Sequence, residues 1–493
     1  MLNTRGLRAR APVLVAVVAV LLAGAGVWLV AGAGGDVLRR HTVVDGVPLD
    51  VVRPATAAGR RPGVVVAHGF AGSARLMAPI GDTLAARGFV VVLLDFSGHG
   101  AHERGLPSDA DAAEAARQRD LDVAVAHLRG LPGVDPARIA LVGHSMGAGA
   151  VTRYAAGHPG ITATVAISLP EASDVAPGRP ERLLLLVGGL EFAGFRDAAD
   201  EAARNGGDAV VVVPAVEHIS ILYAPRAHRE IGRWLDGGGG VAPSPLRGVA
   251  GAGLLLLALL IGVYPLSRLL LGGVSGSWPP AVVPRFGRVL GVAAGAAAVA
   301  ALVAPILPTT RLPLAVGGYV VGFTLVAGGV MLVWTRVRGA GSAASGGAAG
   351  RSGRVRVGVA VLVLVAYAAV AVAVPLHVGV THAVPTGPRW WLLALVWAGF
   401  ALLAYGSERL TGGNSVGLLA VSAVVTVALT GAALVGLAPG FVLLVVPLLA
   451  VLLAWQAVWS AVLHRFAVPY WAIALVGSLL VAWPVATALP VVV

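Results

Sequence analysis

Residues 134–148 read V-D-P-A-R-I-A-L-V-G-H-S-M-G-A, and this stretch decides the fold. Arg138–Val142 is a short apolar run, typical of a strand that is buried on both faces. Gly143–Gly147 then has the pattern glycine, any residue, serine, any residue, glycine, and a helix-like segment runs from Met146 to Gly157. The glycines permit a tight turn that exposes the Ser145 hydroxyl above a sheet. A glycine-rich turn without chemistry is the alternative, but the strand before it and the helix after it favour a nucleophilic serine.

The surrounding sequence repeats the alternation of strand and helix. A hairpin around Asp45-Gly46 is predicted from the β-rich runs His41–Val44 and Leu49–Arg53. The further predicted strands are Gly63–Ala67, Phe89–Leu94, Ile161–Ile167, Arg182–Val187 and Ala209–Val213, and the helix-like segments between them are Arg75–Arg87, Asp109–Arg129, Phe195–Asn205 and Ile219–Leu235. Residues 36–240 are therefore predicted to form an α/β domain with a doubly wound, mostly parallel sheet.

Two residues downstream of Ser145 are candidates to complete a catalytic triad. Glu191 comes just past the strand Arg182–Val187, and His218 lies in the loop after Ala209–Val213. The carboxyl ends of parallel strands gather at one edge of such a sheet, which is where its sites form. We expect His218 to take the Ser145 proton and Glu191 to orient the imidazole. A surface histidine is the alternative for His218, and Asp197 is the alternative acid.

The turn His68-Gly69-Phe70 follows the strand Gly63–Ala67. The backbone N–H groups of Phe70 and Met146 are predicted to form an oxyanion hole for a tetrahedral intermediate. An ordinary glycine turn is the alternative, and His68 itself is expected to support the loop. The segment Asp95–Gly100 is interpreted as a structural turn in which His99 is solvated or caps the backbone.

The chain as a whole is more apolar than a soluble protein of this size, so part of it is expected to face a lipid bilayer. Hydrophobic residues make up 57% of the 493 residues, and the mean hydropathy is +0.85. Residues 1–10 are predicted to be a cytoplasmic tail, and residues 11–33 are predicted to be a membrane anchor or a signal sequence. Ala31-Gly32-Ala33 resembles a cleavage site for a signal peptidase. Residues 237–245 are predicted to be a linker, and residues 246–493 are predicted to be a membrane domain. Eight spans are predicted in that last part, near 248–267, 287–307, 313–335, 357–378, 390–406, 416–436, 440–461 and 467–489.

Charge is distributed unevenly and predicts an orientation. The segment from Asp36 to Asp236 holds 23 of the 24 acidic and 20 of the 36 basic residues, and Glu408 is the remaining acid. Outside it, Arg residues cluster in alternate loops, mainly those on the predicted inner side, with only Arg311 and Arg389 in outer loops. This pattern follows the positive-inside rule, so the N-terminus is expected in the cytoplasm and the α/β domain outside. The loop Arg336–Arg356, rich in Gly, Ala and Ser, is predicted to be disordered.

Composition also excludes several kinds of partner and site. The basic residues outside the segment Asp36–Asp236 lie between apolar runs rather than on one folded face, so nucleic acid is not expected as a partner. There is no cysteine, which excludes disulfides, thiol catalysis and thiolate metal sites. No metal or cofactor site is predicted.

Taken as a set, five segments resemble the α/β-hydrolase superfamily, near its serine-aminopeptidase and dienelactone-hydrolase-like branches. They are H-G-F at 68–70, D-F-S-G-H-G at 95–100, the stretch 134–148, G-G-L-E at 188–191 and E-H-I-S at 217–220. The resemblance covers about 200 residues and implies ester, thioester or amide hydrolysis without a cofactor. The segment from Ser168 to Pro180, where relatives often insert a helical cap, is short here, so an open site is expected.

Three functional hypotheses follow. The first is a membrane-anchored serine hydrolase of carboxylesterase or lipase type at the cell membrane, acting on an ester or acyl substrate that the lipid bilayer presents. The second is an acyltransferase that passes the acyl group from Ser145 to an envelope lipid or glycan. The third is a transporter or sensor whose hydrolase-like domain only binds. Against ion-coupled transport, the predicted spans contain no Asp, Glu or Lys.

Overall fold

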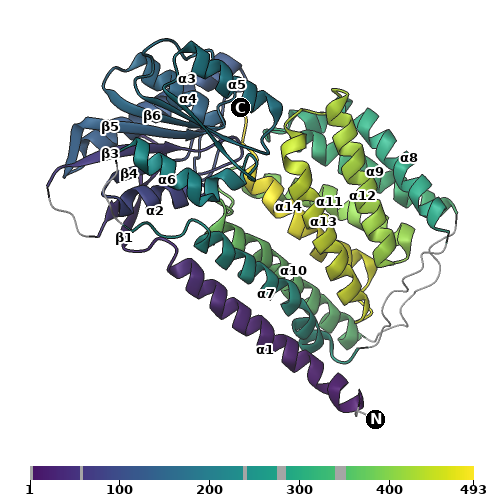
Figure 1. Ribbon diagram of the computed structural model, residues 1–493. Coiled ribbons are helices and arrows are strands. Elements are labelled where there is room, and N and C mark those ends of the chain that lie inside the picture. Colours follow the sequence, from purple (N-terminus) through teal and green to yellow (C-terminus); the bar gives the residue numbers. More distant parts are fainter. Residues whose placement is uncertain (1–3, 56–58, 237–240, 275–284, 339–350) are drawn as a thin grey trace. The chain divides into compact units, whose positions relative to one another are not determined.

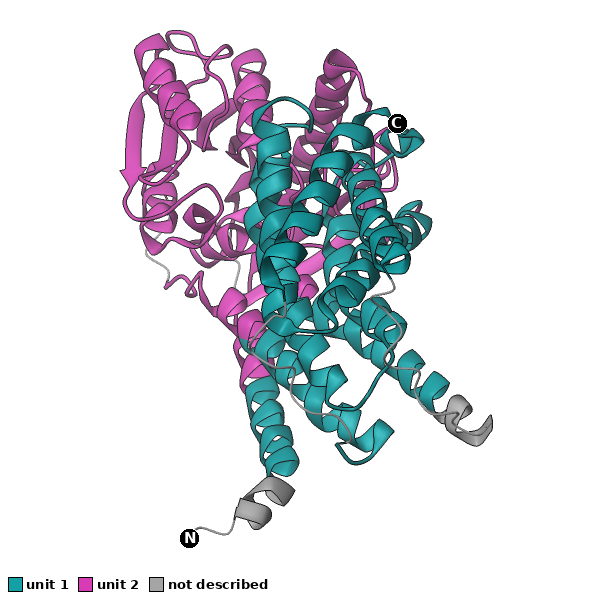
Figure 2. Ribbon diagram, turned by 90° about the vertical axis from the view of Figure 1, so that its right-hand side faces the viewer, with its two compact units in different colours: residues 1–24, 254–375, 388–489 teal, residues 25–253, 376–387, 490–493 magenta. Residues whose placement is uncertain are grey.

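The structure is a computed structural model that describes residues 4–55, 59–236, 241–274, 285–338 and 351–493. It divides into two compact units, coloured separately in Figure 2. The first comprises residues 1–24, 254–375 and 388–489 and is called the helical unit below. The second comprises residues 25–253, 376–387 and 490–493 and is called the hydrolase unit. Each unit is therefore built from segments that are far apart in the sequence.

The hydrolase unit is built on one eight-stranded sheet with the order β1-β2-β4-β3-β5-β6-β7-β8. The strands are β1 (Val37–Val44), β2 (Val47–Pro54), β3 (Arg61–Ala67), β4 (Val90–Leu94), β5 (Val134–His144), β6 (Ile161–Ile167), β7 (Leu183–Gly188) and β8 (Ala209–Val213). The pairs β1–β2 and β2–β4 are antiparallel, and every pair from β4 to β8 is parallel. The predicted α/β fold class is confirmed.

Helices cover both faces of this sheet (Figure 1). They are α2 (Ala78–Ala86), α3 (Ala110–Gly130), α4 (Met146–Gly157), α5 (Ala193–Asn205), the 3₁₀ turn η1 (Ser220–Tyr223) and α6 (Pro225–Trp234). On one face α2, η1 and α6 pack against side chains such as Val66 and Val142. On the other face α3 and α4 pack against the alternate side chains, such as Val65 and Leu141, and α5 continues this layer. Strands buried on both faces explain the continuous Val and Leu runs.

The predicted strands and helices agree closely with the structure. Strands β6 and β8 and helix α4 have the predicted bounds, and the predicted helix 219–235 is divided into η1 and α6. Pro225 stands at the first position of α6, where its ring starts the helix and its missing N–H costs no hydrogen bond. The division therefore has a local cause.

In the described residues, nine helices are long and apolar enough to cross a membrane. They are residues 11–31 of α1 (Thr4–Ala31), α7 (Arg247–Leu271), α8 (Phe286–Val303) with η2 (Ala304–Ile306), α9 (Gly317–Val337), residues 357–379 of α10 (Arg351–Gly379), α11 (Arg389–Thr411), α12 (Ser415–Leu434), α13 (Val442–His464) and α14 (Tyr470–Ala488). A short 3₁₀ turn, η3 (Pro308–Arg311), precedes α9. These helices match the predicted anchor and the eight predicted spans, so the chain has the make-up of a multi-pass membrane protein.

Within the helical unit, α11 packs against α9 and α14, while α12 packs against α8 and α13. Gly328 of α9 lies against the backbone of Leu402 and Leu403, and a side chain there would overlap it. Small residues permit this close approach of helix backbones, as is common between helices in membranes. Close packing of helix backbones therefore contributes to the stability of the unit.

Two charged residues lie deeper in the helical unit than the sequence predicted. Arg389 was expected in an outer loop, but it begins α11, is 1% exposed, and donates hydrogen bonds to the Ala486 and Leu489 carbonyls at the end of α14. Glu408 was expected beyond the span 390–406, but α11 continues to Thr411 and Glu408 is 2% exposed. The statement that the spans contain no acidic residue is therefore wrong. Both charges can be buried because they have hydrogen-bond partners more than fifty residues away in the sequence. A hydropathy pattern contains no information on such distant partners, so the burial could not be predicted.

Two of the sequence interpretations fall outside the described residues. They are the glycine-rich part of the linker, residues 237–240, and most of the predicted disordered loop, residues 339–350.

Candidate active site

Ser145 stands in the turn between β5 and α4, as the sequence predicted. Its backbone has φ 53° and ψ −120°, a left-handed conformation that is unusual for a residue with a side chain. The Ser145 N–H donates to the Ile167 carbonyl of β6 over 2.8 Å, which fixes the turn to the neighbouring strand. A methyl group on Gly143 would overlap the Gly147 carbonyl, and one on Gly147 would overlap the His68 carbonyl. Both glycines are required because the backbones meet here.

Ser145, His218 and Glu191 form one hydrogen-bonded chain. His218 Nε2 lies 3.1 Å from Ser145 Oγ, and His218 Nδ1 lies 2.6 Å from Glu191 Oε1. The three residues follow the carboxyl ends of β5, β8 and β7, so the sheet order brings them together. With Nδ1–H donating to the carboxylate, Nε2 is left to accept the Ser145 hydroxyl proton. Asp197, the alternative acid, is exposed on α5.

The acid and the imidazole are both buried and further supported. Glu191 and His218 are each 4% exposed. Ser168, which follows β6, donates from its hydroxyl to Glu191 Oε2 over 2.7 Å, so both carboxylate oxygens have a partner. The Phe195 ring lies beside the imidazole with the centroids 4.5 Å apart. The sequence interpretation did not include Ser168 or Phe195, because both act through tertiary contacts and neither belongs to a motif.

His144 supports the loop that carries His218. Its Nε2 lies 2.9 Å from the His218 carbonyl, and its ring centroid lies 4.8 Å from that of His218. Burial, together with the charge of His218, lowers the pKa of His144 to about 3. His144 is therefore neutral near pH 7, and since a carbonyl only accepts hydrogen bonds, its proton is on Nε2. It positions the His218 backbone without adding a charge.

The loop after β3 lies directly beside Ser145. A methyl group on Gly69 would lie 3.0 Å from Ser145 Cβ. Phe70 follows in this loop, and Met146 is the first residue of α4, whose N–H has no acceptor within the helix. The two residues predicted to form an oxyanion hole are thus in the two segments that border the serine.

Buried polar contacts hold this loop in place. His68 Nδ1 donates to the Gly69 carbonyl over 2.7 Å and its Nε2 accepts from the Phe96 N–H over 3.1 Å, which agrees with the supporting role expected for it. Burial lowers the pKa of His68, so the ring remains neutral. Asp95 accepts from the Ala74 and Ala101 N–H groups over 2.6 and 2.8 Å and so joins the loops after β3 and β4.

Of the two alternatives expected for His99, solvation is wrong, whereas a hydrogen bond that caps the backbone is observed. His99 is completely buried, and its Nδ1 donates to the Ser97 carbonyl over 3.0 Å. Its ring lies against both His68 and Phe70, with centroid distances of 5.1 and 5.9 Å. The turn after β4 therefore packs under the loop that carries Phe70, which a pattern of turn residues does not reveal.

Two segments from the far end of the chain complete the hydrolase unit. In residues 376–387, the Thr381 hydroxyl lies 2.9 Å from Ser73 Oγ, and the His382 N–H donates to the same oxygen over 3.0 Å. In residues 490–493, the Val491 N–H donates to the Gly98 carbonyl over 2.8 Å, and Val492 forms a parallel bridge with Leu106. Both segments hold loops that flank the site. Sequence patterns gave no sign of this, because short loops beyond membrane spans have no periodicity.

No group of three or more His, Asp or Glu side chains within the described ranges is arranged to hold a metal ion. The chemistry that the site's own residues can perform is nucleophilic attack by a hydroxyl with proton transfer to an imidazole.

The chain has relatives over part of its length. Residues 59–185 match the family model described as "Serine aminopeptidase, S33". Two uncharacterized proteins of Mycobacterium tuberculosis, from strains CDC 1551 / Oshkosh and ATCC 25618 / H37Rv, are each 32% identical over 142 residues, which is 27% of this chain and 47% of each relative. The chain thus spans about half the length of these relatives.

Solved structures give a similar picture at lower identity. A hypothetical protein from Pseudomonas aeruginosa is 14% identical, with a TM-score of 0.35, over 41% of this chain and 94% of that one. A putative dienelactone hydrolase from Klebsiella pneumoniae subsp. pneumoniae is 18% identical, with a TM-score of 0.33, over 41% and 98% of the two chains. The sheet order, the turn at Ser145 and the family model together show that the hydrolase unit has the α/β-hydrolase fold, joined here to a set of apolar helices.

Proposed function

We propose that this protein is a membrane-anchored serine hydrolase that cleaves an ester, or a related thioester or amide, through an acyl-enzyme on Ser145. The observation that supports this best is the chain of hydrogen bonds from Ser145 through His218 to Glu191. It is supported further by the strained backbone at Ser145, which presents the hydroxyl at the carboxyl edge of the sheet.

In the proposed reaction, Ser145 Oγ attacks the substrate carbonyl while His218 Nε2 takes the hydroxyl proton. The negative oxygen that forms is stabilised by the N–H groups of Phe70 and Met146. His218 then gives its proton to the leaving alcohol, and the acyl group remains on Ser145. Water, activated by His218, releases the acid and restores the serine. Glu191 holds the Nδ1 side of the ring and stabilises the imidazolium that forms twice in the cycle.

We propose further that the substrate is an acyl ester presented at a membrane surface. The first strand of the hydrolase unit, β1, begins a few residues after α1, and a linker of nine residues that reaches at most about 30 Å precedes α7. Residues 376–387 follow α10 and residues 490–493 follow α14, so hydrogen bonds tie the unit to the chain at two further points. Such a unit does not diffuse far from the bilayer that holds its helices.

Labelling with a fluorophosphonate probe tests the nucleophile. The full-length wild type should be labelled and should hydrolyse a short-chain soluble ester, while Ser145→Ala should do neither. Ser108→Ala is the matched control, because Ser108 is exposed and its side chain is outside the proposed site. Labelling of the Ser145→Ala protein at wild-type level would refute the assignment.

The proposed location of the substrate needs a separate experiment. The protein is reconstituted in vesicles, and a long-chain ester is placed either in the same vesicles or in a second population. We expect hydrolysis of the long-chain ester only in the shared vesicles, and equal hydrolysis of a soluble ester in both mixtures. Equal cleavage of the long-chain ester in both arrangements would contradict a membrane-presented substrate and leave the serine hydrolase assignment intact.

A further inference from the structure

The helical unit contains a buried carboxylate that the hydrolase chemistry does not use. Glu408 of α11 is 2% exposed, and two residues of α13 bind it. The Ser460 hydroxyl donates to Glu408 Oε1, and His464 Nε2 lies 2.9 Å from Glu408 Oε2. A carboxylate inside a membrane span is costly to bury, and such residues usually serve proton or ion binding.

His464 occupies the position through which a proton can reach Glu408. It is the last residue of α13, and its side chain is 14% exposed, compared with 3% for that of Glu408. The Tyr470 ring at the start of α14 lies edge-on to the imidazole, with the centroids 5.3 Å apart. The imidazole therefore stands between the buried carboxylate and the end of its helix, where α13 and α14 are joined.

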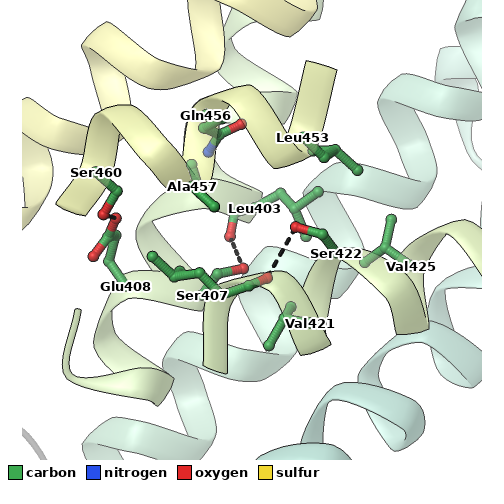
Figure 3. A pocket seen from close by; sticks show the side chains of 12 residues that line it. Leu403, Ser407, Glu408, Val421, Ser422, Val425, Leu453, Gln456, Ala457 and Ser460 are labelled. Carbon is green, nitrogen blue, oxygen red and sulfur yellow. Dashed lines mark hydrogen bonds between the residues drawn. The ribbon is translucent and has the colours of Figure 1, made fainter. Parts of the chain in front are cut away.

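Glu408 and Ser460 also line a small cavity, shown in Figure 3. The cavity offers about 20 Å³ to the centre of a water molecule, which is enough for one water and too little for an organic ligand. Ser407 and Ser422 also line it, and their hydroxyls donate to the Leu403 and Leu418 carbonyls over 2.8 and 2.9 Å. Since these hydrogens are engaged, the oxygens can act only as acceptors toward the cavity. The cavity beside Glu408 thus contains hydroxyl oxygens that can accept a hydrogen bond.

Few charged groups lie on the described helices that pack against α11 and α13. Of the helices packed against α11 and α13, α12 has no titratable residue, α14 contributes Tyr470, and α9 contributes Arg336 in its exposed last turn. Arg409 and Arg465 follow Glu408 and His464 directly in the sequence. Among these groups His464 is the one whose side chain can accept a proton at one ring nitrogen and release a proton from the other.

We propose that Glu408, Ser460 and His464 form a proton-binding site in the helical unit, loaded through His464. In this step His464 begins neutral, with its proton on Nε2. Nδ1 takes a proton from water, the Nε2–H bond breaks and an O–H bond forms at Glu408 Oε2. One proton has then entered, and both the carboxyl and the imidazole are neutral. The site is independent of Ser145 and gives the helices a role beyond anchoring.

Infrared spectroscopy of the full-length protein in vesicles tests the site directly, since a protonated carboxylic acid has a carbonyl stretch that a carboxylate lacks. Between about pH 9 and pH 4 the wild type should gain a band of this kind that Glu408→Gln lacks. Ser460→Ala should shift the band, because one hydrogen bond to the carboxyl is lost. Glu201→Gln, which changes an exposed glutamate of the hydrolase unit, is the control and should retain the band.

The route is tested by the rate at which the band appears after a rapid drop in pH. His464→Gln retains an N–H donor for Glu408 but does not transfer a proton, so the rate should fall at least about tenfold while the final band is unchanged. If the Glu408→Gln protein does not fold, Glu408→Asp replaces it as the test of the assignment. The carbonyl band of Glu408→Asp should be present but shifted. If the wild type lacked the band over this pH range, Glu408 and His464 would form a permanent ion pair and the proposal would be overturned. An unchanged rate in His464→Gln would overturn the proposed route through His464.

Discussion

At the scale of single residues, Ser145 determines whether the proposed chemistry occurs. We expect Ser145→Ala to lower kcat of ester hydrolysis to below about 1% of wild type, because a triad nucleophile contributes several orders of magnitude. The fold should be retained, since the substitution removes one hydroxyl from a half-buried turn. Turnover of a soluble ester by the purified variant measures this, and a residual rate above that level would refute the nucleophile.

The acid can be tested by paired substitutions. Glu191→Gln removes the charge next to His218 Nδ1 and should lower kcat by about 10²–10⁴-fold. Asp197→Asn is its matched control and should stay within about twofold of wild type, because Asp197 is exposed on α5. Greater damage from the Asp197 change would show that the acid is misassigned.

Ser168 offers a finer test of how the triad is held. Ser168→Ala leaves Glu191 Oε2 without its hydroxyl donor in a buried site, which costs about 1–3 kcal/mol. We expect kcat to fall and KM to remain near its wild-type value, because the lost bond orients the acid and does not contact substrate. A rise in KM alone would contradict this positioning role.

The pH dependence of turnover follows from the neutral His144. Its pKa is lowered to about 3 by burial, so it remains uncharged wherever the enzyme is active. His144 should therefore contribute no ionisation to the plot of kcat/KM against pH near neutral pH. Two superimposed rising ionisations would indicate that His144 also titrates in the active range.

At the scale of elements, one buried histidine joins three of them. His228 of α6 accepts from the Thr83 hydroxyl of α2 over 2.7 Å and donates to the Leu222 carbonyl of η1 over 2.8 Å. Burial lowers the pKa of His228 to about 4, below its unfolded value near 6.5, so the folded state resists protonation. Stability from this group is complete above about pH 6.5 and is lost as the pH falls toward 4.

We therefore expect the hydrolase unit to lose about 2–3 kcal/mol between pH 7 and pH 4.5 on account of His228. His228→Gln does not titrate, so its melting temperature should fall less than that of the wild type over the same interval. Melting curves at both pH values measure the difference. An equal fall in both proteins would place the acid sensitivity elsewhere in the unit.

The sequence predicted the elements well where local pattern determines them. The strand, turn and helix around Ser145 could be predicted from their hydrophobic pattern and the positions of the glycines. The residues just past β7 and β8 could be predicted as site residues, because sites in an open α/β sheet form at the carboxyl ends of the strands. Ser168, Asp95 and the burial of His99 could not be predicted, because each depends on which loops lie together in space. Glu408 was misplaced for the same reason: hydropathy ends a span at a charge, whereas Ser460 and His464 permit the charge to be buried.

At the scale of the whole molecule, the composition of the hydrolase unit constrains the topology. The parts of its three segments that lie outside these helices follow α1, α10 and α14, so we expect all of them on one side of the membrane. Four helices lie between the first pair of segments and four between the second, and an even number returns the chain to the same side. This count is independent of the positive-inside rule, which favours the same arrangement with the unit outside.

Single cysteines can test this arrangement without background, because the chain has none. Val384→Cys lies in the segment 376–387 and should react with a membrane-impermeant maleimide added to intact cells. Ala467→Cys, exposed between α13 and α14, should react only after the membrane is opened. The opposite pattern would place the hydrolase unit in the cytoplasm.

The contribution of residues 490–493 to the hydrolase unit has a consequence for biosynthesis. A ribosome that has completed β8 and α6 has released most of this unit, but the backbone partners of Gly98 and Leu106 are still hundreds of residues away. The nascent unit must wait until α14 has been synthesised and inserted before its loops can close. We therefore expect maturation of the hydrolase unit to depend on insertion of the helices, so that a chain stalled or misinserted along the way has an unfinished site.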